Sequence, residues 1–188
     1  MSMPAQLIRP HVTLDQLLKG ISHAPAIRIH GLSSDSRRLH NGDVFVALAG
    51  ESSHGLDFIN QALDAGVAAI LYDPRTTEAD PGQCNVPLIP VNELAVRLGN
   101  IANRWYGSPS AQMAVTGVTG TNGKTTIAFL IAQCRQLLQY KSAYIGTLGA
   151  GMDELSDDAA MTTPACIDLH ELLAEFRDAG ATDVALEV

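Results

Sequence analysis

Two patterns of apolar residues alternate along the chain. One is a short apolar run, and the other is a longer stretch in which apolar residues recur every three or four positions. Short apolar runs bounded by Gly, Pro, Asn or Asp predict strands at the beginning of 26–50 and over 44–48, 67–73, 87–91, 113–118, 142–148 and 182–188. Apolar residues three and four positions apart predict helices over 13–21, 54–66, 92–107, 124–140 and 164–180. Strands that alternate with helices are typical of βαβ units, so the pattern predicts an α/β protein with parallel sheet.

The ends and faces of these helices can also be predicted. Thr13 and Asn92 occupy N-cap positions, and Gly66 closes the helix over 54–66. The helix over 124–140 is predicted to be amphipathic, with one apolar stripe made of Ile127, Leu130, Ile131, Cys134 and Leu138. The residues that follow 148 are predicted to form a loop.

A boundary between two domains is predicted at the small, polar stretch SPSA, residues 108–111, because it lies between a finished helix and a new strand. We expect a small mixed α/β N-terminal domain over 1–108. The beginning of a P-loop-type parallel-sheet ATPase domain is expected over 109–188. The last predicted strand ends at residue 188, so we expect the chain to be a truncated piece of a longer protein with an incomplete second domain.

Composition and charge limit the classes of partner. The 188 residues are 46% hydrophobic and 17% charged, and the formal net charge of -8 argues against nucleic acid as a partner. No apolar run is long enough for a signal peptide or a membrane span, so a cytoplasmic protein without a membrane partner is expected. Cys84, Cys134 and Cys166 are widely separated, which is typical of reduced packing residues.

The stretch AVTGVTGTNGKTT, residues 114–126, has the chemistry of a phosphate-binding loop. The usual motif reads G-x-x-x-x-G-K-[ST], and here Val118 stands in place of the first glycine. Gly120 and Gly123 allow the backbone to turn its N–H groups toward a ligand, and a helix begins directly behind them. Lys124 can reach terminal phosphates, and Thr125 can offer a hydroxyl to Mg²⁺.

The segment GVTGTNGKTT resembles the ATP loop of the Mur ligase family, the ATP-dependent enzymes that add amino acids to the peptidoglycan precursor. The resemblance extends over nearly the whole chain from about residue 28. It implies that ATP and Mg²⁺ are the cofactors and that Lys124 is catalytic. The residues that it implies for nucleotide binding are Gly120, Thr121, Asn122, Gly123, Lys124, Thr125 and Thr126.

Three further segments carry the resemblance. The stretch over 32–71 is similar to the domain that binds the uridine end of the substrate, and MTTP at 161–164 is similar to a segment that contacts substrate. ALEV at 185–188 is similar to the strand whose glutamate binds Mg²⁺. The residues implied for substrate are Ser34, Ser36, Glu51, Ser52, Ser53, Thr162 and Thr163, and those implied for metal are Thr125 and Glu187.

Some of these residues have structural alternatives. Asp35 and the serines of SSDSRR could simply cap a polar turn, and Arg37 could bind phosphate or form an ion pair. Thr162 and Thr163 could cap the helix that follows Pro164. A charge at Glu187 would be costly in its apolar run without a partner, and a carboxylate at the end of a parallel strand points into the ligand crevice.

Within the family, the chain is most similar to the members that add the third amino acid, diaminopimelate or lysine, to UDP-MurNAc-L-Ala-D-Glu. The implied reaction uses ATP to make an acyl phosphate, which the amine of the amino acid attacks. The implied partners are UDP-MurNAc-dipeptide and an amino acid, and we expect a monomer. The 188 residues alone are expected to be inactive. A different Mur-type ligase (MurF type) and a non-catalytic nucleotide-sugar binding module remain alternatives.

Overall fold

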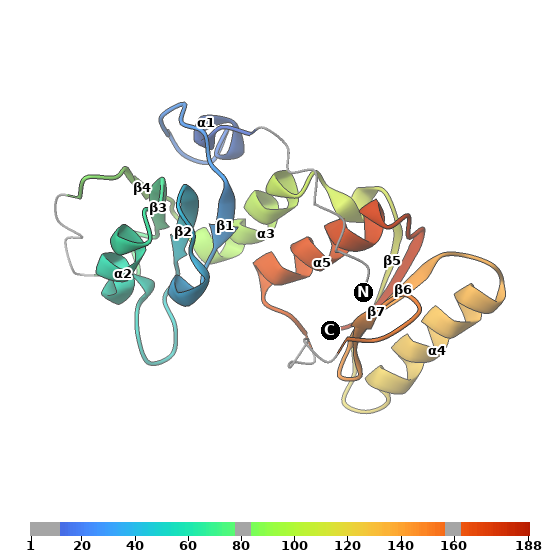
Figure 1. Cartoon of the computed structure of the whole chain (residues 1–188). Helices are drawn as coiled ribbons and strands as arrows, with labels where there is room; N and C mark the ends of the chain where they lie inside the picture. The colour runs from blue at the N-terminus through green and yellow to red at the C-terminus, as the bar shows by residue number, and fades with distance from the viewer. Residues whose placement is uncertain (1–11, 78–83, 157–162) are drawn as a thin grey trace. The chain divides into compact units, whose positions relative to one another are not determined.

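The computed structural model describes residues 12–77, 84–156 and 163–188 (Figure 1). The described chain divides into two compact units, and the change from one to the other falls between Trp105 and Tyr106. Each unit has its own sheet. The α/β class with parallel strands, predicted from the alternation of the two periods, is confirmed. The assignment of a separate function to 1–108 and to 109–188 stays a prediction.

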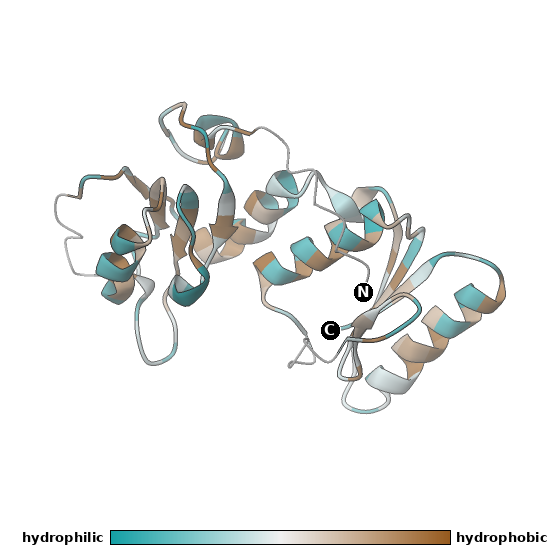
Figure 2. Cartoon of the chain, viewed as in Figure 1, coloured by the Kyte–Doolittle hydropathy of each residue, from teal (hydrophilic) through white to brown (hydrophobic). Residues whose placement is uncertain are grey.

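The first unit is built on a four-stranded sheet in which all neighbouring strands are parallel, in the order β1-β2-β3-β4. Its strands are β1 (Gly31–Ser33), β2 (Asp43–Ala47), β3 (Ala69–Tyr72) and β4 (Leu88–Pro90). Its helices are α1 (Leu14–Leu17), η1 (Ser36–Arg38), η2 (Gly55–Phe58), α2 (Ile59–Asp64) and α3 (Leu94–Trp105). Figure 2 shows α2 alternating between hydrophilic and hydrophobic segments, as expected of a helix with one buried face.

The core of this unit explains why β2 reads as an unbroken apolar run. All five residues of β2 are buried, since helices or loops cover both faces of the strand. Phe45 of β2 lies beside Ile70 of β3 in the register of the sheet, and both belong to a cluster that also contains Ala62 of α2. Burial of such side chains contributes about 1.5–3 kcal/mol each to folding.

The second unit has the strand order β5-β8-β6-β7. Its elements are η3 (Pro109–Ala111), β5 (Ala114–Val118), α4 (Lys124–Leu137), β6 (Ser142–Gly146), β7 (Gly149–Gly151), α5 (Cys166–Asp178) and β8 (Asp183–Glu187). The expected loop after 148 is wrong, because β7 pairs antiparallel with β6 there. Its sequence, GAG, carries no periodic signal, so only the pairing with β6 defines it as a strand.

No helix in the described segments is both long and apolar enough to cross a membrane.

Helix α4 packs on the sheet with a face that only partly overlaps the predicted stripe, since Ile131 alone of that stripe is packed against the cluster at this face. Its buried residues are Ala128 and Ala132, which join a cluster with Tyr144 of β6 and Ala185 of β8. Ile127 and Leu130 of the predicted stripe are each 50% exposed. Small side chains allow the helix to approach the strands closely, and the large aromatic ring of Tyr144 fills the space that they leave.

The beginning of α3 also differs from the prediction. The acceptor for its first N–H groups is Asp73, at the end of β3, rather than the predicted Asn92. The Oδ2 atom of Asp73 accepts hydrogen bonds from the N–H groups of Glu93 (2.8 Å) and Leu94 (3.3 Å). Glu93 has φ 60°, and this turn brings both N–H groups toward the carboxylate. Burial alone would raise the pKa of Asp73, but hydrogen bonds from Arg75 and Glu93 outweigh it, and the pKa is lowered.

Replacement of the buried carboxylate should therefore weaken the first unit in a pH-dependent way. We expect Asp73→Asn to reduce the free energy of unfolding at pH 7 by about 1–3 kcal/mol. Because the folded-state pKa lies below the ordinary value of 3.8, the contribution is complete above that value and is lost as the pH falls through the folded pKa. Urea unfolding followed by the fluorescence of Trp105, the single tryptophan, measures the difference.

The matched control is Asp64→Asn, at an exposed position of α2. This substitution should change the free energy of unfolding by less than about 0.5 kcal/mol. A deficit of Asp73→Asn that stays constant from pH 7 to pH 2 would contradict the capping role of the carboxylate.

Candidate functional site

The loop between β5 and α4 has the backbone geometry expected of a phosphate-binding loop. Gly120 has φ 150° and Gly123 has φ 78°, conformations that side chains other than glycine rarely adopt. Gly123 is the N-cap of α4, a helix of 14 residues, so the first N–H groups of the helix point toward the loop. The Nζ atom of Lys124 donates a hydrogen bond to the Gly120 carbonyl (2.8 Å), which places its ammonium group over the loop.

The two residues predicted for metal lie together beside this loop. Glu187 is opposite Val118 in the register of β5 and β8, so its side chain stands at the carboxyl end of the sheet. The Thr125 hydroxyl, at the second position of α4, donates a hydrogen bond to Glu187 Oε2 (3.0 Å). Parallel pairing of two strands thus joins residues that are 62 positions apart in sequence.

Glu187 is only 1% exposed, and four donors surround its carboxylate. Oε1 accepts from the Tyr144 hydroxyl and from the Thr147 N–H (2.8 Å). Oε2 accepts from the hydroxyls of Thr125 (3.0 Å) and Thr147 (3.2 Å). Burial alone would raise the pKa of Glu187, but these hydrogen bonds outweigh it and the pKa is lowered. Burial and the bond to Glu187 raise the pKa of Tyr144 to about 12.

These residues fit a hard divalent cation. An ionised carboxylate and a hydroxyl are oxygen ligands, and Mg²⁺ is usually held by one or two carboxylates together with substrate phosphates. Across the described part of the chain, no group of three or more His, Cys, Asp or Glu side chains could form a complete metal cage. Thr125 and Glu187 would hold the cation next to the loop, where phosphates would supply further oxygens.

The predicted substrate segment also reaches this edge of the sheet. The Thr163 hydroxyl donates a hydrogen bond to the Glu187 carbonyl oxygen (3.1 Å). The N-cap of α5 is Ala165, and no side chain makes a capping hydrogen bond there. Thr163 therefore does not cap this helix, which was the structural alternative. Thr162 lies outside the described residues.

A second candidate site is a cavity of about 680 Å³ in the first unit. It lies beyond the carboxyl ends of β1 and β2, where parallel sheets commonly bind ligands. Its lining is formed by Ser34, Asp35, Ser36, Arg37, Phe45, Leu48, Ala49, Gly50, Ser53, Gly55, Phe58 and Gln61. Of the predicted substrate residues, Ser34, Ser36 and Ser53 thus line one cavity. Glu51 and Ser52 are exposed and are not among the lining residues.

Phe58 and Gln61 are among the lining residues that the sequence analysis did not select. The Phe58 side chain is 42% exposed, and Gln61 accepts a hydrogen bond from the Ser36 hydroxyl (2.6 Å). The predicted helix over 54–66 contains both residues, but only the fold shows which of its faces meets the cavity. Arg37 forms a two-fold hydrogen-bonded ion pair with Asp35, and this pair holds the pKa of Asp35 at about 2.

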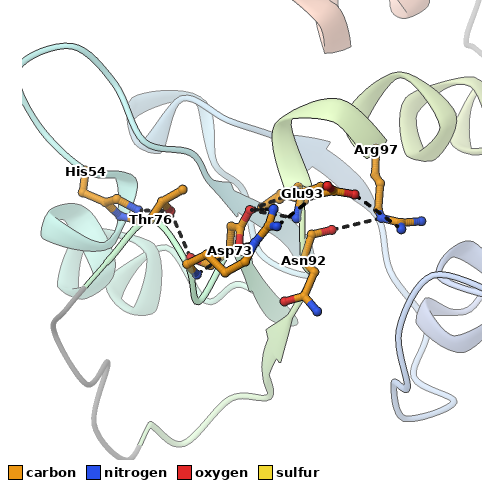
Figure 3. A network of polar contacts seen from close by, with 8 residues as sticks. His54, Asp73, Thr76, Asn92, Glu93 and Arg97 are labelled. Atoms are coloured by element: carbon orange, nitrogen blue, oxygen red, sulfur yellow. Dashed lines mark hydrogen bonds and ion pairs between the residues drawn. The ribbon is translucent and has the colours of Figure 1, made fainter.

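His54 lies between two lining residues, Ser53 and Gly55, and its imidazole ring anchors this loop by hydrogen bonds (Figure 3). Its Nδ1 atom accepts a hydrogen bond from the Leu56 N–H (3.1 Å), and its Nε2 atom lies 3.0 Å from the Thr76 hydroxyl. The Thr76 hydroxyl in turn donates to the Asp73 carbonyl (2.9 Å). This chain of contacts ties the cavity loop to the same turn after β3 that caps α3.

Comparison with known families places segments of both units in one family. Residues 28–106 match the profile described as Mur ligase family, catalytic domain, and residues 118–188 match the Mur ligase middle domain. The chain belongs to the Mur ligase family. The first matched segment contains the cavity, and the second contains the phosphate loop and Glu187. The family resemblance of the sequence is thereby confirmed.

Two named Mur ligases illustrate the similarity. The UDP-N-acetylmuramoyl-L-alanyl-D-glutamate–2,6-diaminopimelate ligase of Xylella fastidiosa (strain 9a5c) is 44% identical over 183 residues, which are 96% of this chain and 36% of the relative. The enzyme of the same name from Coxiella burnetii (strain RSA 493 / Nine Mile phase I) is 41% identical over 178 residues, 93% of this chain and 36% of the relative. The chain thus spans about a third of the length of the curated relatives it matches.

Solved Mur ligase structures show the same fold. A UDP-N-acetylmuramoyl-L-alanyl-D-glutamate–2,6-diaminopimelate ligase superimposes with a TM-score of 0.78 and 28% identity, over 95% of this chain and 36% of the other. MurF from Acinetobacter baumannii superimposes with a TM-score of 0.64 over 99% of this chain and 36% of the other. The identity with MurF is 21%, so this second likeness shows the fold alone.

The convergence of donors on Glu187 requires Gly146 to lack a side chain. A Cβ atom at this position would collide with Glu187 Oε1 and with the Tyr144 hydroxyl. We therefore expect Gly146→Ala to lower the free energy of unfolding by about 2–4 kcal/mol, since the carboxylate would lose its partners or move. Differential scanning calorimetry of the chain measures the change.

Gly99, inside α3, provides the matched substitution. No atom lies within 4 Å of a Cβ built there, and its φ is not positive. Gly99→Ala should stabilise by about 0.5–1 kcal/mol, because alanine favours helix. Equal effects of the two replacements would show that Gly146 is not under steric constraint.

Proposed function

We propose that this chain forms the uridine-nucleotide and phosphate-loop portion of an ATP-dependent ligase of cell-wall precursor synthesis. The ligase would add 2,6-diaminopimelate to UDP-MurNAc-L-Ala-D-Glu. The observation that carries the proposal is the contact of Thr125 with the buried carboxylate of Glu187 at the beginning of α4, in a chain 44% identical to a ligase of that name. We further propose, on the family resemblance alone, that the enzyme acts in the cytoplasm and as a monomer.

The reaction would proceed in two steps. The γ-phosphoryl group of ATP passes to the terminal carboxylate of the dipeptide, which yields ADP and an acyl phosphate. The amine of the incoming amino acid then attacks the acyl carbon, and an amide and inorganic phosphate result. No side chain of this chain has to form a covalent bond in either step.

The residues of the loop would supply positioning and charge. The N–H groups around Gly120, Thr121, Asn122 and Gly123, with Thr126 behind them, would cradle the phosphates, because the beginning of α4 carries a partial positive charge. Lys124 would exchange its hydrogen bond with the Gly120 carbonyl for one with a phosphate oxygen. Mg²⁺, held by Thr125 and Glu187, supplies neutralisation of phosphate charge when it is bound.

The cavity of the first unit would hold the uridine end of the precursor. Its lining combines one partly exposed ring, Phe58, with hydroxyls of Ser34, Ser36 and Ser53, which suits a base and a diphosphate. Thr163 would contact the peptide end next to Glu187. Glu51, Ser52 and Thr162 are retained as proposed substrate contacts on the family resemblance alone. The pocket for the amino acid would lie in a part of the protein beyond these 188 residues.

The ring of Phe58 provides a direct test of the cavity. We expect Phe58→Ala to weaken the binding of UDP-MurNAc-dipeptide about threefold to tenfold, because stacking of a base on an aromatic ring contributes roughly 0.5–1.5 kcal/mol. Isothermal titration calorimetry with the full-length protein measures the dissociation constant. Val96→Ala, at a position 79% exposed on α3, serves as a control that should bind like the unmodified protein. Unchanged affinity in both variants would show that the uracil base does not stack on Phe58 in this cavity.

Lys124 provides the test of ligase activity. The full-length protein should form the amide from UDP-MurNAc-dipeptide, diaminopimelate and ATP, and Lys124→Ala should lower the rate by at least about a hundredfold. The affinity for UDP-MurNAc-dipeptide should stay within twofold. Phosphate release and mass spectrometry of the product measure both steps.

One control variant and two further outcomes of this assay separate the alternatives. Lys141→Ala, an exposed lysine before β6, should retain full activity. Use of UDP-MurNAc-tripeptide in place of the dipeptide would favour a MurF-type ligase. Absence of ATP turnover by the unmodified full-length protein would support the non-catalytic binding module, whereas equal turnover by Lys124→Ala and the unmodified protein would show that Lys124 takes no part in the mechanism.

A further inference from the structure

The two oxygens of the Glu187 carboxylate have donors of different kinds. Oε1 accepts from a backbone N–H, that of Thr147, and from the hydroxyl of Tyr144. Oε2 accepts hydrogen bonds from two hydroxyls, those of Thr125 and Thr147. A carboxylate offers about four acceptor positions, so these four donors occupy all of them. A cation can therefore coordinate Glu187 only after one donor has turned away.

The donors differ in how easily they can leave. The Thr147 N–H belongs to the backbone that joins β6 to β7, and it cannot rotate without moving the strands. Tyr144 is 2% exposed, and its ring packs edge-on against Phe129 of α4, with 5.5 Å between ring centroids. The hydroxyls of Thr125 and Thr147 can each release Oε2 by a simple rotation, but only Thr125 lies at the beginning of α4, beside the phosphate loop. When the Thr125 hydroxyl turns away, Oε2 can face a cation on the side of that loop.

We propose that Glu187 coordinates the divalent cation through Oε2 alone and that Tyr144 and Thr147 are positioning residues for this bond. In this arrangement the cation takes the place of the Thr125 hydroxyl proton on Oε2. The Tyr144 hydroxyl and the Thr147 N–H keep Oε1, and the Thr147 hydroxyl keeps the second position of Oε2. The inference rests on the proposed function, since it presupposes a cation at this carboxylate.

The geometry of β6 supports the assignment. Tyr144 and Gly146 lie at the carboxyl end of β6, Thr147 directly follows this strand, and β6 lies directly beside β8 in the sheet. Gly146 leaves the space through which the tyrosine hydroxyl and the carboxylate meet. A residue pair of this kind orients a metal ligand from outside the coordination shell, and removal of such partners usually costs about 10–100-fold in metal affinity.

Binding of Mn²⁺ to the full-length protein in the presence of ADP tests this assignment without reference to turnover. Electron paramagnetic resonance of free Mn²⁺ gives the dissociation constant. We expect Tyr144→Phe and Thr147→Val each to weaken Mn²⁺ binding about tenfold. Thr147→Ser keeps both the hydroxyl and the N–H, so it should bind Mn²⁺ within about twofold of the unmodified protein. All three should bind UDP-MurNAc-dipeptide normally.

Phe129→Leu is the control for packing. This substitution removes the ring contact with Tyr144 but none of the donors to Glu187. It should lower the thermal midpoint of unfolding and leave Mn²⁺ affinity within about twofold. If Phe129→Leu weakened Mn²⁺ binding as much as Tyr144→Phe, the role of Tyr144 would be one of packing, and the inference would be overturned.

Glu187→Gln separates failure of the inference from failure of the proposed function. Unchanged Mn²⁺ binding in Glu187→Gln would show that no cation binds this carboxylate, and the proposed function would lose its metal site. Weak binding in Glu187→Gln together with normal binding in Tyr144→Phe and Thr147→Val would keep the metal site and refute the positioning roles. A crystal structure of the Mn²⁺–ADP complex with both carboxylate oxygens on the metal would refute coordination through Oε2 alone.

Discussion

An ionised carboxylate that is withdrawn from water costs several kcal/mol unless donors replace the water, and Glu187 is in this situation. The strand order β5-β8-β6 supplies the donors, because β8 lies between β6 and the strand that leads through the phosphate loop into α4. Thr125 follows β5, while Tyr144 and Thr147 lie at the end of β6. The close approach of these groups demands glycine at 146, so the local sequence of β6 depends on a residue in another strand.

Both units place their candidate sites by the same rule. In a parallel sheet all strands end at one edge, and the loops that leave this edge meet there. In the first unit, Ser34 follows β1, the cavity loop around Ser53 follows β2, and Asp73 follows β3. The turn after β3 does two things at once, since it caps α3 and supports the cavity loop through Thr76 and His54.

Some features could be predicted because they depend on nearest neighbours in sequence. The glycines of the phosphate loop, Lys124 at the beginning of a helix, and the α/β alternation all belong to this kind. Predictions failed where the partner is remote. The cap of α3 comes from Asp73, strand β7 exists only through its pairing with β6, and α4 buries Ala128 and Ala132 instead of its larger apolar residues. Neither the periodicity nor the composition of α4 shows which of its small residues allow the helix to approach the sheet most closely.

The sequence by itself determined the family, the α/β class, the phosphate loop and the need of Glu187 for a partner. These follow from residue types at short spacing and from the cost of burying a charge. Only the tertiary structure decided which groups surround Glu187, and that Ser34, Ser36 and Ser53 share one cavity with Phe58. The physical reason is that parallel pairing joins strand ends across long stretches of sequence, and the register that aligns Val118 with Glu187 depends on the whole sheet.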